Sequence, residues 1–379
     1  MEGYPGKVKL VSTHRPRKHP YKVSKVIRRE IHRTYDRVYA TIYGQCIGDG
    51  IGLLTEGLKK SEVKRHFKEV YERLEFLHKK CLPDAHRRKW CEADWTDETD
   101  QMLLIFKSII VKKGLVDPID FAKRLMHWCN EGLTELGDVT SPGVCSQVKA
   151  VVSHPQFSEE PFRASEIIWR DCGMYVASNS AVARTCILGL HQYETLGQVI
   201  KNTLDVCHVT HYDPRCEASC VAVTTTIALM LQKNERHLKR NGKYDLEAVI
   251  DEAYMFSSRF LKTPTDVKEL KSYMYCSCLK DLDLDETGKQ HYTYKALGAG
   301  FWALRRKDFR QAIQDIVLEG GDSDANAAVA GALLGCKLGL DAIPMSWIEP
   351  LKHRAWLDDL VDKYFDMIER KKKQKETVV

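Results

Sequence analysis

Two pairs of acidic residues stand at the starts of apolar, helix-like stretches, where they could carry chemistry. Asp97 and Glu98 lie in the segment DWTDETDQMLLIF, and Asp322 and Asp324 lie in EGGDSDANAAVAGALLG. Carboxylates are favoured at a helix N-terminus, because its free N–H groups and its dipole attract negative charge. Helix capping therefore explains either pair when it is considered alone.

The two pairs taken together indicate more than capping. Both of the stretches that follow are strongly apolar, so we expect both helix starts to lie near the core. Four carboxylates that converged there would repel one another unless cations neutralised them. Oxygen ligands with no His or Cys between them suit Mg²⁺ or Mn²⁺ better than Zn²⁺. This pattern is compatible with two divalent ions that hold and activate a water molecule.

A third candidate is the glycine-rich segment GQCIGDGIGLLTEG, residues 44–57. We expect its glycines to form a turn that carries Asp49, with Glu56 seven residues further on. The carboxylate of Glu56 could act as a general base or orient a substrate. The segment lacks the GxxxxGK[ST] order of a P-loop, and no strand precedes it, as a dinucleotide fingerprint requires.

The elements that must position these residues are helices. Apolar residues recur at helical spacing along most of the chain, and the alternation typical of strands is hardly visible. We therefore predict an all-α fold, a single compact bundle of many helices. The predicted helices include residues 100–114, 165–178, 216–234, 293–306 and 323–339.

The helix predicted at residues 323–339 carries a stripe of small residues. Ala327, Gly331, Gly335 and Gly339 recur every four residues, which leaves a smooth face where another backbone can approach closely. The segment is too short and too interrupted to be a membrane span with a dimer face. We predict a buried central helix.

Composition places the chain among soluble globular proteins. Its 379 residues are 44% hydrophobic and 29% charged, and no apolar run has the length of a membrane span. The first residues lack the apolar core of a signal peptide, so we expect a cytoplasmic or nuclear protein with no membrane partner. Thirteen cysteines, an odd number, indicate reduced thiols in such a chain.

Positive charge is concentrated at the two ends. The net charge is +6, yet residues 1–39 alone hold eleven Lys or Arg against three acids, and the tail ERKKKQKETVV is a second basic patch. Such ends could touch nucleic acid or another anionic surface. Solvated basic ends explain the same pattern, and we expect no nucleic-acid partner.

Three ordered segments resemble the ADP-ribosylglycohydrolase family, which includes the dinitrogenase reductase activating glycohydrolases and the J1 crystallins. Residues 44–57 resemble the family's GxxxGDxxGxxxE, DWTDETDQMLL resembles WTDDT, and EGGDSDANAAVAGALLGCKLGLDAIPMSW resembles GGDxDTxAAxAGAxxG with a downstream IPxxW. SNSAVARTCILGL is similar to the family's NGxxMR segment, and Thr210-His211 falls at its T-H pair. The resemblance runs from about residue 36 to 355. It implies an all-α bundle with a central metal cleft.

The resemblance also implies an activity and residue roles. It predicts a Mg²⁺-dependent hydrolase that removes ADP-ribose from a modified protein side chain or a small conjugate, with two Mg²⁺ ions or Mn²⁺ in their place. We expect a monomer with a basic extension at 1–35, the family domain at 36–365 and a basic tail at 366–379. The implied catalytic residues are Glu56 and Asp97, the substrate-binding residues are Asp49, Asn179 and His211, and the metal ligands are Thr96, Asp97, Glu98, Asp322 and Asp324.

Four positions depart from the family pattern. Glu98 replaces an Asp and is one methylene longer, and Ala325 replaces a Thr and so lacks a hydroxyl ligand; Ser180 and Ala183 replace Gly and Met. Water can replace one neutral oxygen at Mg²⁺, but a displacement on the order of 1 Å in an active site can cost about a hundredfold in rate. The alternative function is therefore a weakened or inactive family member that binds ADP-ribose or is structural, like the crystallins.

Overall fold

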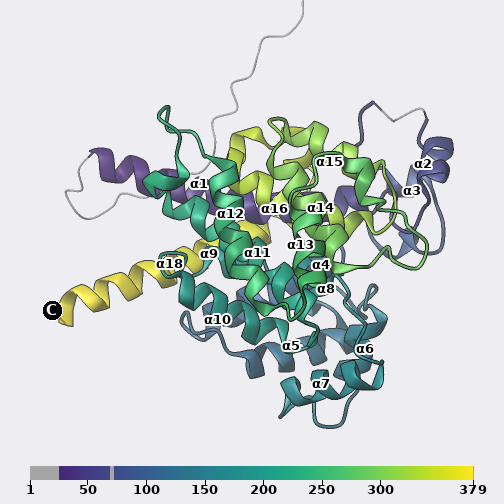
Figure 1. Cartoon of the computed structure of the whole chain (residues 1–379), viewed down its shortest axis with the longest axis horizontal. Coiled ribbons are helices and arrows are strands. Elements are labelled where there is room, and N and C mark those ends of the chain that lie inside the picture. The colour runs from purple at the N-terminus through teal and green to yellow at the C-terminus, as the bar shows by residue number, and fades with distance from the viewer. Residues whose placement is uncertain (1–24, 69–71, 379) are drawn as a thin grey trace, which may run out of the picture.

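A computed structural model describes residues 25–68 and 72–378 of the chain. These residues form eighteen α-helices and six 3₁₀ helices, and the only β-pairing among them is two isolated bridges, Ser178 with Tyr292 and Leu238 with Tyr244. The all-α prediction is confirmed (Figure 1). The α-helices are α1 (Lys25–Gly52), α2 (Lys60–His66), α3 (His78–Cys81), α4 (Asp97–Val111), α5 (Pro118–Glu131), α6 (Ser146–Val152), α7 (Pro161–Asp171), α8 (Ser180–Ala183), α9 (Cys186–Leu190), α10 (Leu196–Cys207), α11 (Pro214–Gln232), α12 (Leu246–Ser257), α13 (Pro264–Met274), α14 (Thr293–Leu304), α15 (Phe309–Val317), α16 (Ser323–Leu338), α17 (Met345–Ile348) and α18 (Arg354–Val378). The 3₁₀ helices are η1 (Arg87–Lys89), η2 (Thr134–Leu136), η3 (Glu235–His237), η4 (Ser258–Phe260), η5 (Leu279–Leu282) and η6 (Leu340–Ala342).

The core is built around α16, which packs against α1 on one side and α14 on another (Figure 1). Every residue of α16 from Ser323 to Cys336 is buried, so the predicted central helix is confirmed. The small-residue stripe lets α1 and α16 meet backbone to backbone. A Cβ placed on Gly331 would lie only 1.9 Å from the carbonyl oxygen of Gly44. No larger residue fits at such a contact.

The glycine-rich segment around Asp49 is helical, so the expected turn there is wrong. Helix α1 continues to Gly52, and Asp49 lies in its last turn. The reason is the same close packing: a Cβ on Gly48 would lie 2.0 Å from the carbonyl oxygen of Ala327 in α16. These glycines allow α1 to pack closely against α16. The chain turns only at residues 53–57, after α1 has ended.

The helix predicted at 165–178 is also partly wrong. Helix α7 begins earlier, at Pro161, and ends at Asp171. Gly173 and Met174 follow with φ of +78° and +60°, in the left-handed region that a right-handed helix cannot use. The chain then continues to the short contact between Ser178 and Tyr292.

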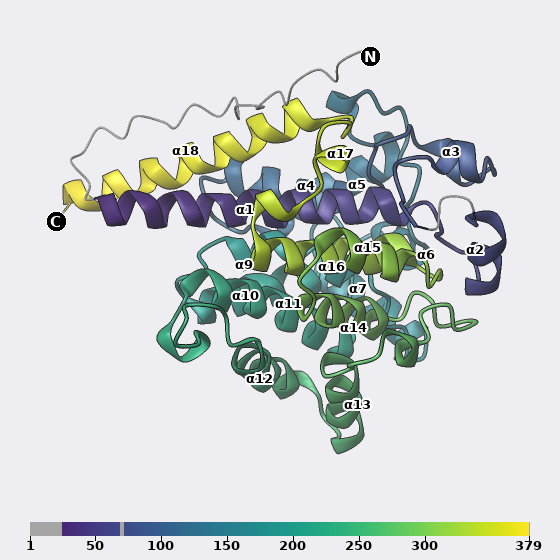
Figure 2. The ribbon, with the colours of Figure 1, turned by 90° about the horizontal axis from the view of Figure 1, so that it is seen from above.

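The long C-terminal helix α18 lies along α1 (Figure 2). The two helices run antiparallel, because Tyr35 donates a hydrogen bond to Glu369 (3.0 Å) while Tyr43 donates one to Asp358 (2.6 Å). The helix continues through the predicted tail from residue 366, and α1 begins at Lys25 inside the predicted extension. Most of that extension lies outside the described residues, and the proposed domain bounds stay a prediction.

The structure also bears on membrane-spanning helices and on the state of the cysteines. None of the helices within the described residues combines the length and apolarity that crossing a bilayer requires. All thirteen cysteines fall within these residues, and each is a free thiol.

Candidate metal centre

Asp49 ties the last turn of α1 to the first turn of α4. Its Oδ2 accepts hydrogen bonds from the backbone N–H groups of Thr96 (3.1 Å) and Thr99 (3.0 Å), and its Oδ1 accepts one from the Thr96 hydroxyl (2.5 Å). Burial raises the pKa of Asp49 to about 6, although these three hydrogen bonds act to lower it. Asp49 has no exposed surface, and its carboxylate is occupied by hydrogen bonds to α4. Its predicted contact with substrate stays a prediction.

Asp322 precedes α16 as its N-cap residue and is held by two donors. Its Oδ2 accepts from the side-chain amide of Asn179 (2.6 Å) and from Nδ1 of His291 (2.7 Å). Burial alone would raise the pKa of Asp322, but the hydrogen bond and charge of His291, together with the hydrogen bond from Asn179, outweigh it and lower that pKa. The same contact raises the pKa of His291 to about 9. Because Oδ2 is engaged twice, Oδ1 of Asp322 remains the oxygen available to a ligand.

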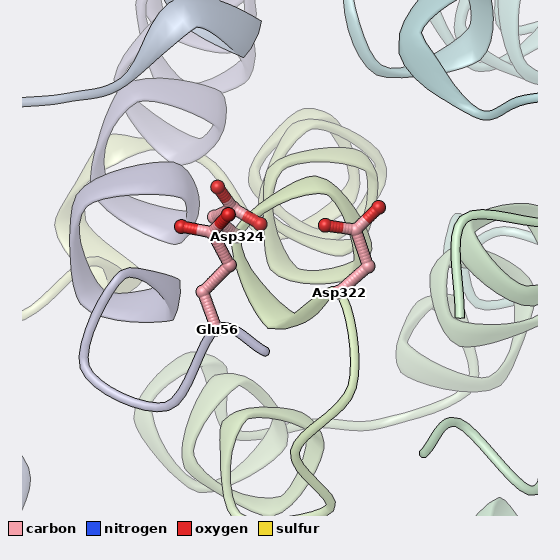
Figure 3. Close-up of side chains that lie close together, drawn as sticks. All are labelled: Glu56, Asp322 and Asp324. Carbon is pink, nitrogen blue, oxygen red and sulfur yellow. The ribbon is translucent and has the colours of Figure 1, made fainter. Parts of the chain in front are cut away.

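Glu56, Asp322 and Asp324 gather at the start of α16 (Figure 3). Each offers a carboxylate oxygen, and these oxygens all lie within 4.8 Å of one another. Glu56 comes from the turn after α1, so the group joins two parts of the chain that are distant in sequence. In Figure 3 the carboxylates of Glu56 and Asp324 lie together, and that of Asp322 faces them across a short gap.

Asp97 and Glu98, in the first turn of α4, share this electrostatic environment. Burial raises the pKa of Asp97 well above its usual value, and the negative charge of Glu56 adds to the effect. Burial does the same for Glu98, with Asp97 and then Asp322 adding to it. Each of these acids therefore disfavours the ionised form of its neighbours. The structure thus places Asp322 and Asp324 together with Glu56, and Asp97 and Glu98 are linked to this group through their charges.

The residues present fit a hard divalent cation. The surplus of buried negative charge would be relieved by positive ions, and all the donors are oxygens. Oε2 of Glu98 is buried and has no hydrogen-bond partner among the described residues, as expected for an atom that awaits a ligand. The Thr96 hydroxyl gives its proton to Asp49 and lies 3.4 Å from Oδ2 of Asp324, so a lone pair is free on that side. The ligand set itself stays a prediction.

A buried chain of hydrogen bonds leads from Asp97 to His211, which the resemblance predicts to bind substrate. Gln101 donates to Oδ2 of Asp97 (3.2 Å) and accepts from Arg184 (2.9 Å), which also donates to the hydroxyl of Thr210 (2.6 Å). His211 bonds Thr210 through Nδ1 and Ser178 through Nε2, both at 2.7 Å. Burial, and then the Arg184 charge, lower the pKa of His211 well below its usual value. His211 is fully buried, and its predicted contact with substrate stays a prediction.

Sequence reasoning missed two histidines that touch the acidic cluster. His291 contacts Asp322, as described above, and Nε2 of His86 lies 2.6 Å from Oε2 of Glu56. Both come from segments without a motif, so no spacing signal could have found them. Gly143 was also missed: a Cβ there would lie 2.2 Å from Oδ1 of Asp97, so this segment crosses the site closely. The Pro-Gly pair at 142–143 was the available signal for a turn.

The fold and the site together define an all-α protein with an acidic centre at two helix N-termini. The chain belongs to the ADP-ribosylglycohydrolase family, whose sequence model matches residues 30–374. This confirms the resemblance noted from the motifs.

Individual relatives are distant. An uncharacterized protein of Archaeoglobus fulgidus is 27% identical over 330 residues, which cover 85% of this chain and 93% of the relative. The ADP-ribosyl-[dinitrogen reductase] glycohydrolase of Rhodospirillum rubrum is 22% identical over 80% of this chain and 86% of its own, and the ADP-ribosylarginine hydrolase Tri1 of Pseudomonas putida is 23% identical over 72% and 66%. A solved ADP-ribosylglycohydrolase-related protein complex has the same fold, with a TM-score of 0.65 at 22% identity, over 89% of this chain and 99% of that one.

Proposed function

We propose that this protein is a hydrolase that removes ADP-ribose from a modified protein side chain or a small ADP-ribosyl conjugate, with Mg²⁺ bound at the acidic cluster. The observation that carries the proposal is the group of three carboxylates, Glu56, Asp322 and Asp324, in a chain of this family. The buried acids Asp97 and Glu98 interact with this group through their charges. The names of two relatives, a glycohydrolase and an ADP-ribosylarginine hydrolase, support the same reaction class.

The reaction breaks the bond between C1″ of the ribose and the acceptor atom. Water adds its oxygen to C1″, and the acceptor leaves with a proton, so that no redox partner is needed. Bound Mg²⁺ supplies positive charge that lowers the pKa of water and offsets the carboxylates. As in glycoside hydrolysis, the carbon passes through an oxocarbenium-like transition state, which nearby carboxylates stabilise.

Glu56 is the acid best placed to handle the proton of water. About 19% of its side-chain surface is exposed, against 7% for Asp322, so it borders the solvent side of the cluster. Its Oε2 is engaged by His86, which leaves Oε1 to accept a proton. The side chain of Asp97 is more buried than that of Glu56 and accepts a hydrogen bond from Gln101. It is therefore suited to binding a cation rather than to transferring protons.

The test is release of free ADP-ribose from Arg-linked, Ser-linked and O-acetyl substrates, each assayed with Mg²⁺ and with EDTA. We expect metal-dependent turnover on at least one linkage, and loss of that turnover in Glu56→Gln. Asp341→Asn, at an exposed acid in η6 beyond the opposite end of α16 from the cluster, is the control and should keep full activity. No metal-dependent release on any linkage would refute the proposed hydrolase.

A second function is supported by the position of Ala325. Its backbone N–H donates to Oδ1 of Asp324 (2.9 Å), but its buried methyl group offers no oxygen toward the cluster. A chain with this loss could bind ADP-ribose without cleaving it. Calorimetry separates the cases: binding of ADP-ribose without hydrolysis of any conjugate indicates a binding protein, and absence of both ADP-ribose and metal binding indicates a structural role.

A further inference from the structure

The turn that carries Glu56, residues 53–57, is held in place by hydrogen bonds from a separate stretch of the chain. This stretch, residues 84–90, includes η1 and has no counterpart among the sequence motifs. We call it the clamp segment. Two of its consecutive residues, His86 and Arg87, contact the turn in different ways: one binds the Glu56 side chain and the other binds the backbone.

Arg87 fixes the backbone of the turn. Its Nε donates to the carbonyl oxygen of Leu54 (3.0 Å), and its Nη2 donates to that of Glu56 (2.5 Å). Its remaining charge is balanced within the clamp segment, because Nη1 and the backbone N–H both bond the carboxylate of Asp84. Arg87 is only 2% exposed, so these contacts are shielded from water. The guanidinium therefore ties two carbonyls of the turn to a structure that lies outside it.

His86 fixes the side chain. Its Nε2 donates to Oε2 of Glu56 at 2.6 Å, and its ring packs edge to face on Trp90, with 5.0 Å between the ring centroids. Trp90 is buried, and its carbonyl oxygen bonds Nε2 of the buried His78 (3.2 Å). The His86 ring thus has a packing contact within its own segment in addition to its hydrogen bond to Glu56.

The turn is also held by the end of α15 and by the connection that leads into α16. The N–H of Gly57 donates to the carbonyl oxygen of Gly321 (2.7 Å), and the hydroxyl of Thr55 donates to that of Val317 (2.5 Å). Glu56 is consequently fixed between the clamp segment and the residues that lead into Asp322. The Glu56 carboxylate lies beside that of Asp324, as Figure 3 shows, and one of its oxygens is within 4.8 Å of a carboxylate oxygen of both Asp322 and Asp324.

We propose that His86 is a positioning residue that acts through Glu56: it holds one carboxylate oxygen so that the other faces the metal and the reacting water, while Arg87 keeps the turn in place. The proposal rests on the proposed function for its consequences in catalysis. It does not depend on that function for the contact itself, which can be tested without substrate.

The experiment is a double-mutant cycle on His86 and Glu56, since a residue that acts only through another has no effect once that other residue is neutralised. We expect His86→Ala to lower kcat/KM, mainly through kcat, and to weaken Mn²⁺ binding in an EPR titration, each by about tenfold to a hundredfold. His86→Gln should recover most of both, because its amide can donate from nearly the same place as Nε2. Arg88→Ala, at the exposed neighbour, is the matched control and should change neither.

In the Glu56→Gln background, His86→Ala should add less than about a twofold change to Mn²⁺ affinity. An equal loss in both backgrounds, or no rescue by Gln, would overturn the positioning role. If the wild type hydrolyses nothing, the proposed function fails and the cycle is read from Mn²⁺ affinity. If the wild type binds no Mn²⁺ either, the measurement is hydrogen exchange of residues 53–57 in the ligand-free protein. Faster exchange in His86→Ala would support the positioning role of His86, and unchanged exchange would refute it.

Discussion

Neutralising Asp324 should stabilise the metal-free protein. Asp324 is buried, and burial followed by the negative charges of Glu56 and Asp322 raises its pKa well above 3.8. An acid whose pKa is raised on folding binds more protons in the folded state, so its contribution to the free energy of unfolding falls as the pH rises from about 4 toward the folded pKa. Asp324→Asn removes this penalty and keeps an oxygen that can accept from the N–H of Ala325.

The size of the effect follows from the spacing of the cluster. Two unit charges 4.8 Å apart, the outer separation of the Glu56, Asp322 and Asp324 oxygens, repel by about 3.5 kcal/mol at an effective dielectric constant of about 20. His291 offsets part of the Asp322 charge, and proton uptake caps the penalty at about 1.4 kcal/mol per pH unit above the unfolded pKa. We expect Asp324→Asn to raise the free energy of unfolding by about 2 to 3 kcal/mol at pH 8, and by less than about 1.5 kcal/mol at pH 5.

The assay is urea unfolding in EDTA at both pH values, with Asp341→Asn as the control that should change little. A second series with Mg²⁺ tests the ligand role. At about one hundred times its dissociation constant, Mg²⁺ should stabilise the wild type by about 2.7 kcal/mol and the Asp324→Asn protein by much less. The electrostatic reasoning is refuted if Asp324→Asn gives no larger gain at pH 8 than at pH 5, or if it destabilises the metal-free protein at pH 8.

Three other perturbations test separate parts of the structure. Glu98→Asp combined with Ala325→Thr should raise Mg²⁺ affinity by about tenfold in calorimetry, because it restores the family's ligand types. Gly331→Ala should lower the free energy of unfolding by about 3 kcal/mol, measured in urea, since the new Cβ would meet the carbonyl oxygen of Gly44 at 1.9 Å. His291→Ala should flatten the pH dependence of the free energy of unfolding in EDTA. The contact with Asp322 raises the pKa of His291 from 6.5 to about 9. The charge of His291 therefore stabilises the folded state fully below pH 6.5, and this stabilisation is lost as the pH rises through 9.

Each of these outcomes has a contrary result. Unchanged Mg²⁺ affinity in the double variant would count against the assignment of Glu98 as a ligand. Gly197→Ala is the control for the glycine contact, because nothing lies within 4 Å of a Cβ there, and it should be neutral or stabilising by up to about 1 kcal/mol. Equal losses in the two glycine variants would contradict the close packing of α1 and α16. A pH profile unaltered by His291→Ala would contradict the Asp322 contact.

Local sequence determined much of this protein. Helical spacing of apolar residues predicted the all-α fold, and the acidic residues before apolar runs marked the starts of α4 and α16 correctly. The stripe from Ala327 to Gly335 predicted a buried central helix. These features are readable because capping and helix periodicity depend on residues only three or four positions apart.

Tertiary structure decided what those local features do. The glycines near Asp49 resembled a turn in sequence, yet they form a helix face, because the matching stripe of α16 lies some 280 residues away. His86 and His291 reach Glu56 and Asp322 from segments without a motif, and only the packing of the whole chain brings them there. The carboxylates that look like ordinary helix caps one at a time become a mutually repelling cluster once the helices converge. Their altered pKa values and their fit to a cation are consequences of burial and of distance in space, which separation along the chain does not encode.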